Sequence, residues 1–266
     1  MVLRVDAHCH VSPVWYEPVE TLLEQMGRNG VDQAVLVQAL GQFDNAYLEQ
    51  CVRRYPGRFA AVVAVDVARA DACTELSALA ARGATGVRLR PDARSPGTDP
   101  FAVWRTAAQE RLAVSCVGSS EKFAALEFAE LVALFPQLAI VLEHLGGTNR
   151  PEDVEGAALR RRVFELAAYP NVYLKVPGLG ELSKRSARLP AAGVALDPRP
   201  EILRHALVCF GAERLLWSSD FPVVSSREGY ANALSWVLAA LGDRSAEERA
   251  KIFGDTARRV FRLHDL

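Results

Sequence analysis

The chain has 266 residues, half of them apolar, and its 31 basic and 32 acidic side chains leave a formal net charge of −1. The length suits one α/β barrel domain over residues 1–266, and the charge balance excludes a broadly basic surface for nucleic acid or an anionic membrane. The five cysteines form no CxxC pair, and the sequence has no signal segment or long apolar run, so we expect a cytoplasmic protein without disulfides.

Short apolar segments alternate along the chain with longer amphipathic segments. The segments expected to form strands are residues 3–8, 33–38, 60–65, 86–90, 112–117, 139–144, 171–176 and 214–219. The helices expected between them are 20–29, 46–55, 70–82, 101–110, 123–135, 155–169 and 200–210, and two further helices, 229–241 and 245–263, follow the last strand. Eight strand–helix units predict parallel pairing and closure into a single (β/α)8 barrel.

An open doubly wound sheet is the alternative architecture. It usually carries a glycine-rich phosphate motif, and the sequence has neither GxGxxG nor GxxxxGK[ST]. The longest irregular stretches, residues 94–99 and 178–199, both follow expected strands and are predicted to be active-site loops.

Polar or ionisable side chains stand at the ends of six of the expected strands. The chain opens with "VLRVDAHCH", in which Asp6, His8 and His10 are expected on one face because strand residues alternate. The other groups at strand ends are Gln38, Arg88 and Arg90, His144 in "LEHLGG", Lys175 in "VYLKVPG" and Asp220 in "WSSDFP". The carboxyl ends of barrel strands meet at one mouth, and buried polar groups are costly unless they are paired or used. The sequence therefore predicts an active site at that mouth.

Each of these residues also has a structural interpretation. Asp220 could cap the turn that follows it, and His144 could anchor its Gly-Gly loop. Arg88 and Arg90 are interpreted as a grip on an anion, because a central parallel strand has no solvated edge. Lys175 is equally compatible with a buried ion pair and with substrate contact.

The ordered set of HxH, a histidine after the sixth strand and an aspartate after the eighth resembles the amidohydrolase superfamily. The resemblance runs over nearly the whole chain and includes "GVRLR" at 86–90, "GAERLLWSSDFP" at 211–222 and "IFGDTARRVFRL" at 252–263. It is greatest to the amidohydrolase-2 branch, which includes 2-pyrone-4,6-dicarboxylate lactonase and sugar lactonases. The "QALGQFDN" segment at 38–45 and the two arginines of "GVRLR" match that branch in particular.

The resemblance implies a hydrolase that opens a lactone of a small carboxylated or polyhydroxylated molecule, and thus a small anionic substrate. The catalytic set is Asp220 as general base toward water, with His8, His10 and His144 polarising the carbonyl. The substrate-binding set is Arg88 and Arg90 for a substrate carboxylate, with Gln38, Asn45 and Lys175 completing the pocket.

One departure from the superfamily concerns metal binding. Metal-dependent relatives carry a histidine or a modified lysine near the end of strand four or five, whereas strand five here reads "LAVSCV". We therefore expect that no metal or other cofactor is required.

Three alternatives stay open. The first is a metal-dependent decarboxylase or amide hydrolase on the same barrel, with a divalent metal such as zinc held by His8, His10, His144 and Asp220. The second is a Schiff-base enzyme that uses Lys175. The third is a catalytically inactive barrel that only binds a ligand.

Overall fold

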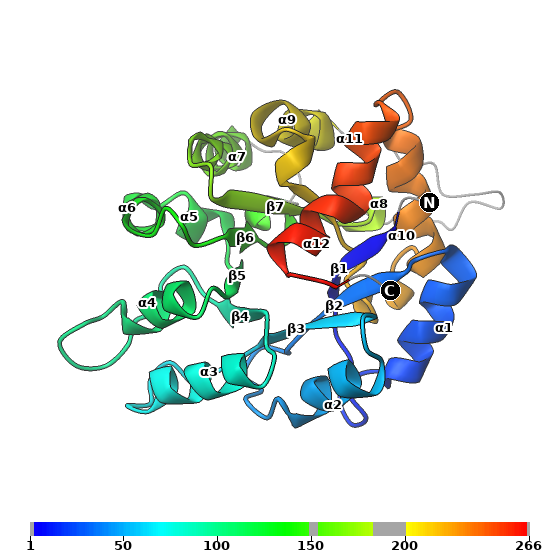
Figure 1. The fold of residues 1–266 in the computed structure, drawn as a ribbon. Helices are drawn as coiled ribbons and strands as arrows, with labels where there is room; N and C mark the ends of the chain where they lie inside the picture. The colour runs from blue at the N-terminus through cyan, green and yellow to red at the C-terminus, as the bar shows by residue number, and fades with distance from the viewer. Residues whose placement is uncertain (1–2, 149–153, 183–200, 265–266) are drawn as a thin grey trace.

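The structure is a computed structural model that describes residues 3–148, 154–182 and 201–264. Its strands form one parallel eight-stranded sheet in which each strand pairs with the next along the chain (Figure 1). In order they are β1 Val5–Cys9, β2 Gln33–Val37, β3 Phe59–Val63, β4 Gly86–Leu89, β5 Ala113–Cys116, β6 Ile140–Leu142, β7 Val172–Val176 and β8 Leu215–Trp217.

The first and last strands meet beyond the end of β8. There the Asp220 N–H donates to the His8 carbonyl at 3.0 Å, and the His10 N–H donates to the Phe221 carbonyl at 2.7 Å. The sheet therefore closes into the predicted (β/α)8 barrel, and the predicted fold is confirmed.

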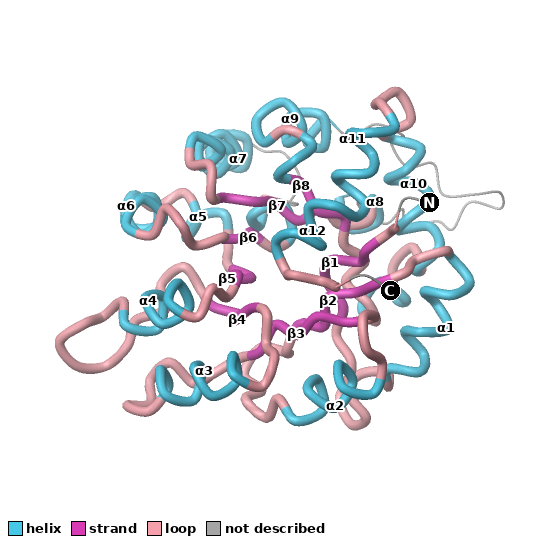
Figure 2. The backbone as a smooth tube through the Cα atoms, viewed as in Figure 1, coloured by secondary structure: helices cyan, strands magenta, loops and turns pink. Residues whose placement is uncertain are grey.

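Helices surround this barrel and lie between successive strands (Figure 2). Their bounds are α1 Val19–Asn29, α2 Ala46–Arg54, α3 Ala72–Ala81, α4 Ala102–Gln109, α5 Ser120–Phe123, α6 Leu126–Leu134, α7 Val154–Glu165, α8 Leu179–Leu182, α9 Glu201–Phe210, α10 Tyr230–Ala240, α11 Ala246–Ala250 and α12 Thr256–Val260. The expected helix over 245–263 is divided, because a π-helical turn at Lys251–Asp255 separates α11 from α12. None of the helices in the described ranges is long and apolar enough to cross a membrane.

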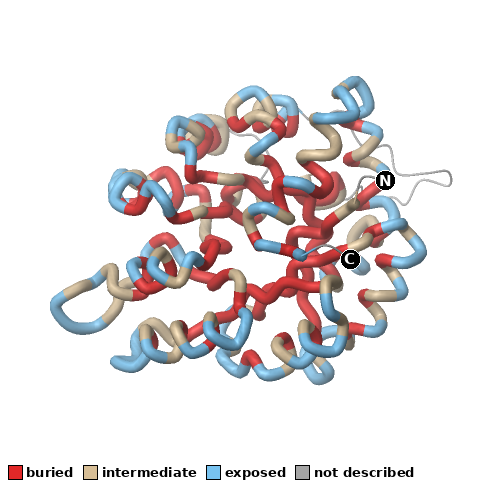
Figure 3. Tube along the Cα trace, viewed as in Figure 1, coloured by how far each residue is buried: buried red, intermediate tan, exposed pale blue. Residues whose placement is uncertain are grey.

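Alternate strand residues fill two apolar clusters, one on each face of the closed sheet. The inner cluster includes Val5, Val35 and Leu216 of the strands together with Phe261, which follows α12. The outer cluster packs the other strand faces against the helices. Figure 3 shows that the buried residues lie mainly in the strands and on the sides of the helices that face them. Because both faces of a barrel strand are buried, the strands are mainly apolar. Apart from Asp6 of β1 and Gln33 of β2, their buried polar side chains lie near the carboxyl ends. Polar side chains on the inner face at those ends therefore mark the site.

The pairing of β1 with β2 shifts register between Asp6 and Cys9, as in a β-bulge. Ala7 belongs to the inner cluster and Cys9 to the outer one, while the Asp6 carboxylate accepts backbone N–H bonds from His8 at 3.2 Å and Ser219 at 2.8 Å. The expectation that Asp6 shares a face with the two histidines was therefore wrong, because the bulge interrupts strict alternation. The bulge turns His8 toward the barrel interior directly after Ala7.

Candidate active site

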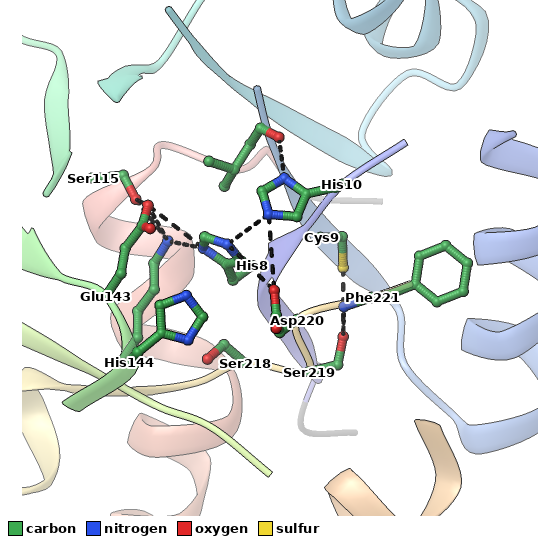
Figure 4. Close-up of polar contacts among 12 residues, drawn as sticks. His8, Cys9, His10, Ser115, Glu143, His144, Ser218, Ser219, Asp220 and Phe221 are labelled. Atoms are coloured by element: carbon green, nitrogen blue, oxygen red, sulfur yellow. Dashed lines mark hydrogen bonds and ion pairs between the residues drawn. The ribbon is translucent and has the colours of Figure 1, made fainter. Parts of the chain in front are cut away.

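His8 of β1 and His10, directly after that strand, face each other at the carboxyl end of the barrel (Figure 4), with 3.1 Å between their Nε2 atoms. The His10 Nδ1 lies 2.7 Å from the Val37 carbonyl, so it carries the proton and leaves Nε2 as an acceptor. The His8 Nδ1 accepts from the Lys175 ammonium at 2.7 Å, which leaves His8 Nε2–H to donate toward His10. Burial, followed by nearby cations, lowers the pKa of both rings, to about 3 for His10. Both imidazoles are therefore neutral near pH 7.

A buried ionic network adjoins His8 and is built from the inner faces of β4, β5 and β7 and from Glu143, directly after β6. Glu143 accepts two bonds from the Arg88 guanidinium, at 3.1 and 2.6 Å, and one from the Ser115 hydroxyl at 2.6 Å. Lys175 donates to Ser115 Oγ at 2.7 Å and lies 3.9 Å from Glu143 Oε1. Burial would raise the pKa of Glu143, but Arg88 and Lys175 hold it well below its usual range. Burial also lowers the pKa of Lys175 to about 8, against the opposing effect of Glu143. Two cations and one anion thus leave this layer with a net positive charge.

Asp220 follows β8 with a backbone φ of +62°, a left-handed conformation that is uncommon outside glycine and clusters at functional sites. Its Oδ1 lies 3.9 Å from His8 Nε2 and 3.8 Å from His10 Nε2, while Oδ2 accepts from Arg227 Nη1 at 3.2 Å. Burial raises the pKa of Asp220 to about 6, although the neighbouring His144 lowers it. The side chain is thus a carboxylate at neutral pH and a stronger base than an exposed aspartate.

His144 packs its ring edge-on against the His8 ring, with 5.4 Å between the two ring centroids. It begins a tight turn of four successive residues with positive φ, His144 to Gly147, which explains the Gly-Gly pair after it. Its Nδ1 pairs with Glu181 Oε1 of α8 at 2.9 Å, so its Nε2 edge is directed away from Glu181. Burial alone would lower the pKa of His144, but the hydrogen bond and charge of Glu181 raise it overall. His144 is therefore the site imidazole that protonates most readily.

Three of these side chains could hold a metal ion together. One ligand atom each from His8, His144 and Asp220 lies within 4.8 Å of the others. Two imidazole nitrogens and a carboxylate oxygen match the ligand preference of zinc, whose tetrahedral ligands sit roughly 3.4 Å apart. The set fits such an ion in chemistry, and in geometry after the side chains close by about 1 Å.

The amides of two predicted substrate-binding residues contact the backbone. Asn45 donates to the Phe43 and Ala64 carbonyls, both at 2.9 Å, and accepts from the Ala64 N–H at 3.0 Å. Gln38 donates to the Asp44 carbonyl at 2.7 Å and accepts from its neighbour's N–H. These bonds fasten the loop after β2 to the end of β3, and contact of either amide with substrate stays a prediction.

The two predicted anion-binding arginines line one cavity of about 500 Å³ beside the site. Arg88 is buried and committed to Glu143 and to the Gln38 carbonyl, to which it donates at 2.9 Å. Arg90 is exposed, and Arg94 lines the same cavity. Arg90 is therefore the better placed of the predicted pair to meet an incoming anion.

Comparison with known proteins identifies the family. The model of the family described as Amidohydrolase matches residues 5–263. The chain belongs to the amidohydrolase family. An L-fucono-1,5-lactonase from Burkholderia ambifaria is 30% identical, over 99% of this chain and 97% of that protein. Family and relative together make this chain a hydrolase.

Two solved structures share the fold of this amidohydrolase. A protein from Pseudomonas putida that carries the name 2-pyrone-4,6-dicarboxylic acid hydrolase is 25% identical, with a TM-score of 0.76 and full coverage of both chains. An amidohydrolase from Burkholderia multivorans with bound zinc is 23% identical, with a TM-score of 0.81 over 98% of this chain and 100% of that one. The resemblance inferred from the motifs is therefore confirmed.

Four residues of this amidohydrolase site were not among those predicted. Glu143 and Ser115 carry a local signal, since each is a polar residue on the inner face near the end of an otherwise apolar strand. Glu181 and Arg227 lie after β7 and β8 in segments without a motif. Only their position after barrel strands could have marked them.

Proposed function

We propose that this amidohydrolase opens a lactone of a small carboxylated or polyhydroxylated molecule, with Asp220 as the general base. The observation that carries this proposal is the Asp220 carboxylate, whose pKa burial raises to about 6, placed 3.8 to 3.9 Å from two neutral imidazoles. A base of this kind suits proton abstraction from water near neutral pH. The lactonase relative, matched over nearly its whole length, supports the reaction class.

Water activation falls to one oxygen of Asp220. Arg227 holds Oδ2, so Oδ1 is the oxygen that accepts the proton of the attacking water. The water oxygen then forms a bond to the lactone carbonyl carbon. As the ring C–O bond breaks, the proton on Asp220 passes to the ring oxygen, which leaves as a hydroxyl group and restores the base.

The oxyanion that forms during attack meets donors on two sides. On one side, the His8 Nε2–H, which donates toward His10 in the resting site, would turn its hydrogen bond to the oxyanion. On the other side, Glu181 raises the pKa of His144 and so favours a protonated ring. The layer of Arg88, Lys175 and Glu143 beside His8 adds a net positive charge in a buried environment, where electrostatic stabilisation is strong. A lactone has a better leaving group than an amide, so these donors suffice for its hydrolysis.

Substrate selection rests on the cavity that Arg88 and Arg90 line. The exposed guanidinium of Arg90 would form a charged hydrogen bond with a carboxylate of the substrate. The buried Arg88 would raise the positive potential of the cavity without a direct bond to the substrate, because it is already paired with Glu143. The partner is thus a small anionic molecule.

Metal-dependent hydrolysis or decarboxylation on the same barrel is the second candidate, favoured by the close ligand atoms of His8, His144 and Asp220. A divalent ion such as zinc, held by these three with His10 alongside, would supply Lewis-acid polarisation of the carbonyl. The ammonium of Lys175 on His8 Nδ1 and the absence of a ligand on β5 Ala113–Cys116 favour the metal-free reaction.

A panel assay tests the proposal. Proton release is followed for L-fucono-1,5-lactone, 2-pyrone-4,6-dicarboxylate and an uncharged lactone, before and after treatment with a strong chelator. We expect hydrolysis of at least one carboxylated or polyhydroxylated lactone, with no loss on chelation. Decarboxylation of an aromatic acid in place of any lactone hydrolysis would refute it.

A further inference from the structure

Two loops at the mouth of the barrel are joined by the consecutive charged residues Arg227 and Glu228, which follow β8. Arg227 Nη1 donates to Asp220 Oδ2 at 3.2 Å and to Glu181 Oε2 at 2.9 Å, and Nη2 donates to the Ser219 carbonyl at 3.3 Å. Glu181 in turn holds His144 through its other oxygen. One guanidinium thus connects the proposed base with the carboxylate that orients His144.

The second charge fixes the loop that carries Glu181. The Glu228 carboxylate is buried against Gly178 and Gly180, and a Cβ at either glycine would collide with its oxygens. Its Oε2 also lies 3.4 Å from Arg227 Nε. A side chain at either position would displace the Glu228 carboxylate from this contact. The contact places Glu181 within reach of both Arg227 and His144.

The charges explain why a cation stands at this position. Asp220 and Glu181 are both nearly buried, with 9% and 7% of their side chains exposed, and each carries a negative charge that repels the other. Arg227 bonds to one oxygen of each carboxylate. The other oxygen of Asp220, Oδ1, then faces His8 and His10. The other oxygen of Glu181, Oε1, faces His144. Without the guanidinium, Asp220 Oδ2 and Glu181 Oε2 each lose a charged hydrogen bond.

We propose that Arg227 is a positioning residue that orients Asp220 and, through Glu181, His144 for lactone opening. This inference rests on the proposed function for its kinetic consequence. The geometric part, the orientation of His144 by Arg227 and Glu181, can be measured without any substrate.

The kinetic test uses Arg227→Ala and Arg227→Lys on the lactone that the wild-type enzyme hydrolyses. Loss of a charged hydrogen bond predicts a fall in kcat of about 10- to 100-fold for Arg227→Ala, with KM nearly unchanged, because Arg227 contacts the base rather than substrate. Arg227→Lys keeps the positive charge but loses the several N–H donors of the guanidinium, so its kcat should lie between those of the wild-type enzyme and Arg227→Ala. Since 20% of the Arg227 side chain is exposed, millimolar guanidinium should restore part of the activity of Arg227→Ala. Arg69→Ala, which removes an exposed arginine paired with Asp71, is the control and should be unaffected.

The structural test is the imidazole ¹⁵N spectrum of the same variants and of Glu181→Gln. The His144 signals should shift in Arg227→Ala and Glu181→Gln, while those of His205 and His264 stay in place. A kcat for Arg227→Ala within twofold of wild type would overturn the proposal. So would a loss that guanidinium does not restore, together with unmoved His144 signals.

The two proposals fail in different ways. If the wild-type enzyme hydrolyses no lactone but the His144 signals move, the proposed function falls and the positioning of His144 stands. If lactone hydrolysis is observed and neither kcat nor the His144 signals respond to Arg227→Ala, the positioning role falls alone. Should Arg227→Ala fail to fold, Arg227→Lys and Glu181→Gln decide by the same readouts.

Discussion

Replacement of Glu143 by glutamine is the most severe single test of the buried network. The wild-type carboxylate is inaccessible to solvent, accepts three hydrogen bonds from Arg88 and Ser115, and lies 3.9 Å from the Lys175 ammonium. Glutamine keeps the shape but removes the charge and turns a donor toward other donors. Removal of one partner of a buried ion pair costs about 3–5 kcal/mol. We therefore expect the free energy of unfolding to fall by about that amount.

Urea denaturation at equilibrium provides the assay, with an unchanged dependence on urea concentration indicating intact two-state behaviour. The pKa of Glu143 in the folded protein lies below its ordinary value of 4.5, so its stabilisation is fully present above that value. It is lost as the pH falls from 4.5 toward the folded pKa. The difference between wild type and Glu143→Gln should therefore be largest near neutrality and should narrow in acid.

The control is Glu49→Gln, which breaks surface pairs with Arg82 and Arg53, whose side chains are 50% and 69% exposed. Surface pairs of this kind contribute about 0–1 kcal/mol. If Glu143→Gln is no more destabilised than this control, the buried network does not stabilise the barrel as argued.

Three further predictions concern catalysis and binding. The value of kcat/KM should fall as the pH drops through about 6, because Asp220 must be ionised. This fall should occur at lower pH in Glu181→Gln, since Glu181 raises the Asp220 pKa. A wild-type kcat/KM that falls only near pH 4 would contradict this prediction. Arg90→Ala should raise KM about 10-fold for a carboxylated lactone and leave an uncharged lactone unaffected; equal effects on both would exclude a carboxylate contact. Asn45→Ala should lower the free energy of unfolding by about 1–3 kcal/mol, because the Ala64 backbone groups lose their partners; a raised KM at unchanged stability would instead indicate substrate contact.

Much of the fold could be predicted from the sequence because a barrel repeats one simple pattern. Buried parallel strands need apolar residues on both faces, so polar groups such as His144 and Asp220 stand out where each strand ends. The alternation of strand residues between the two faces did not place Asp6 correctly, because the bulge in β1 inserts a residue that no local sequence pattern indicates. The predicted loop over 178–199 begins with α8 Leu179–Leu182, and its residues from 183 onward lie outside the described ranges.

The sequence indicated which residue types gather at the candidate site, but not which side chains pair with one another there. Arg88 could be placed on the inner face, yet its pairing with Glu143 depends on the strand order, which brings β4 and the end of β6 together on either side of β5. The same holds for Arg227, which reaches Asp220 and Glu181 only through the folding of two loops. Charge pairing between distant strands is a tertiary property, and a single sequence contains no periodicity that reports it.

The decisive measurement for Asp220 as the base is the hydrolysis rate of Asp220→Asn beside that of chelator-treated wild-type enzyme on the same lactone. Asparagine preserves the shape and can accept from Arg227, but it cannot take a proton from water. We expect kcat to fall about 10²- to 10⁴-fold for Asp220→Asn, while the chelated wild-type enzyme keeps its full rate. A variant that retains more than about a tenth of the wild-type kcat would contradict the assignment of Asp220 as the base. So would wild-type activity that vanishes on chelation and returns with zinc, which would make Asp220 a metal ligand.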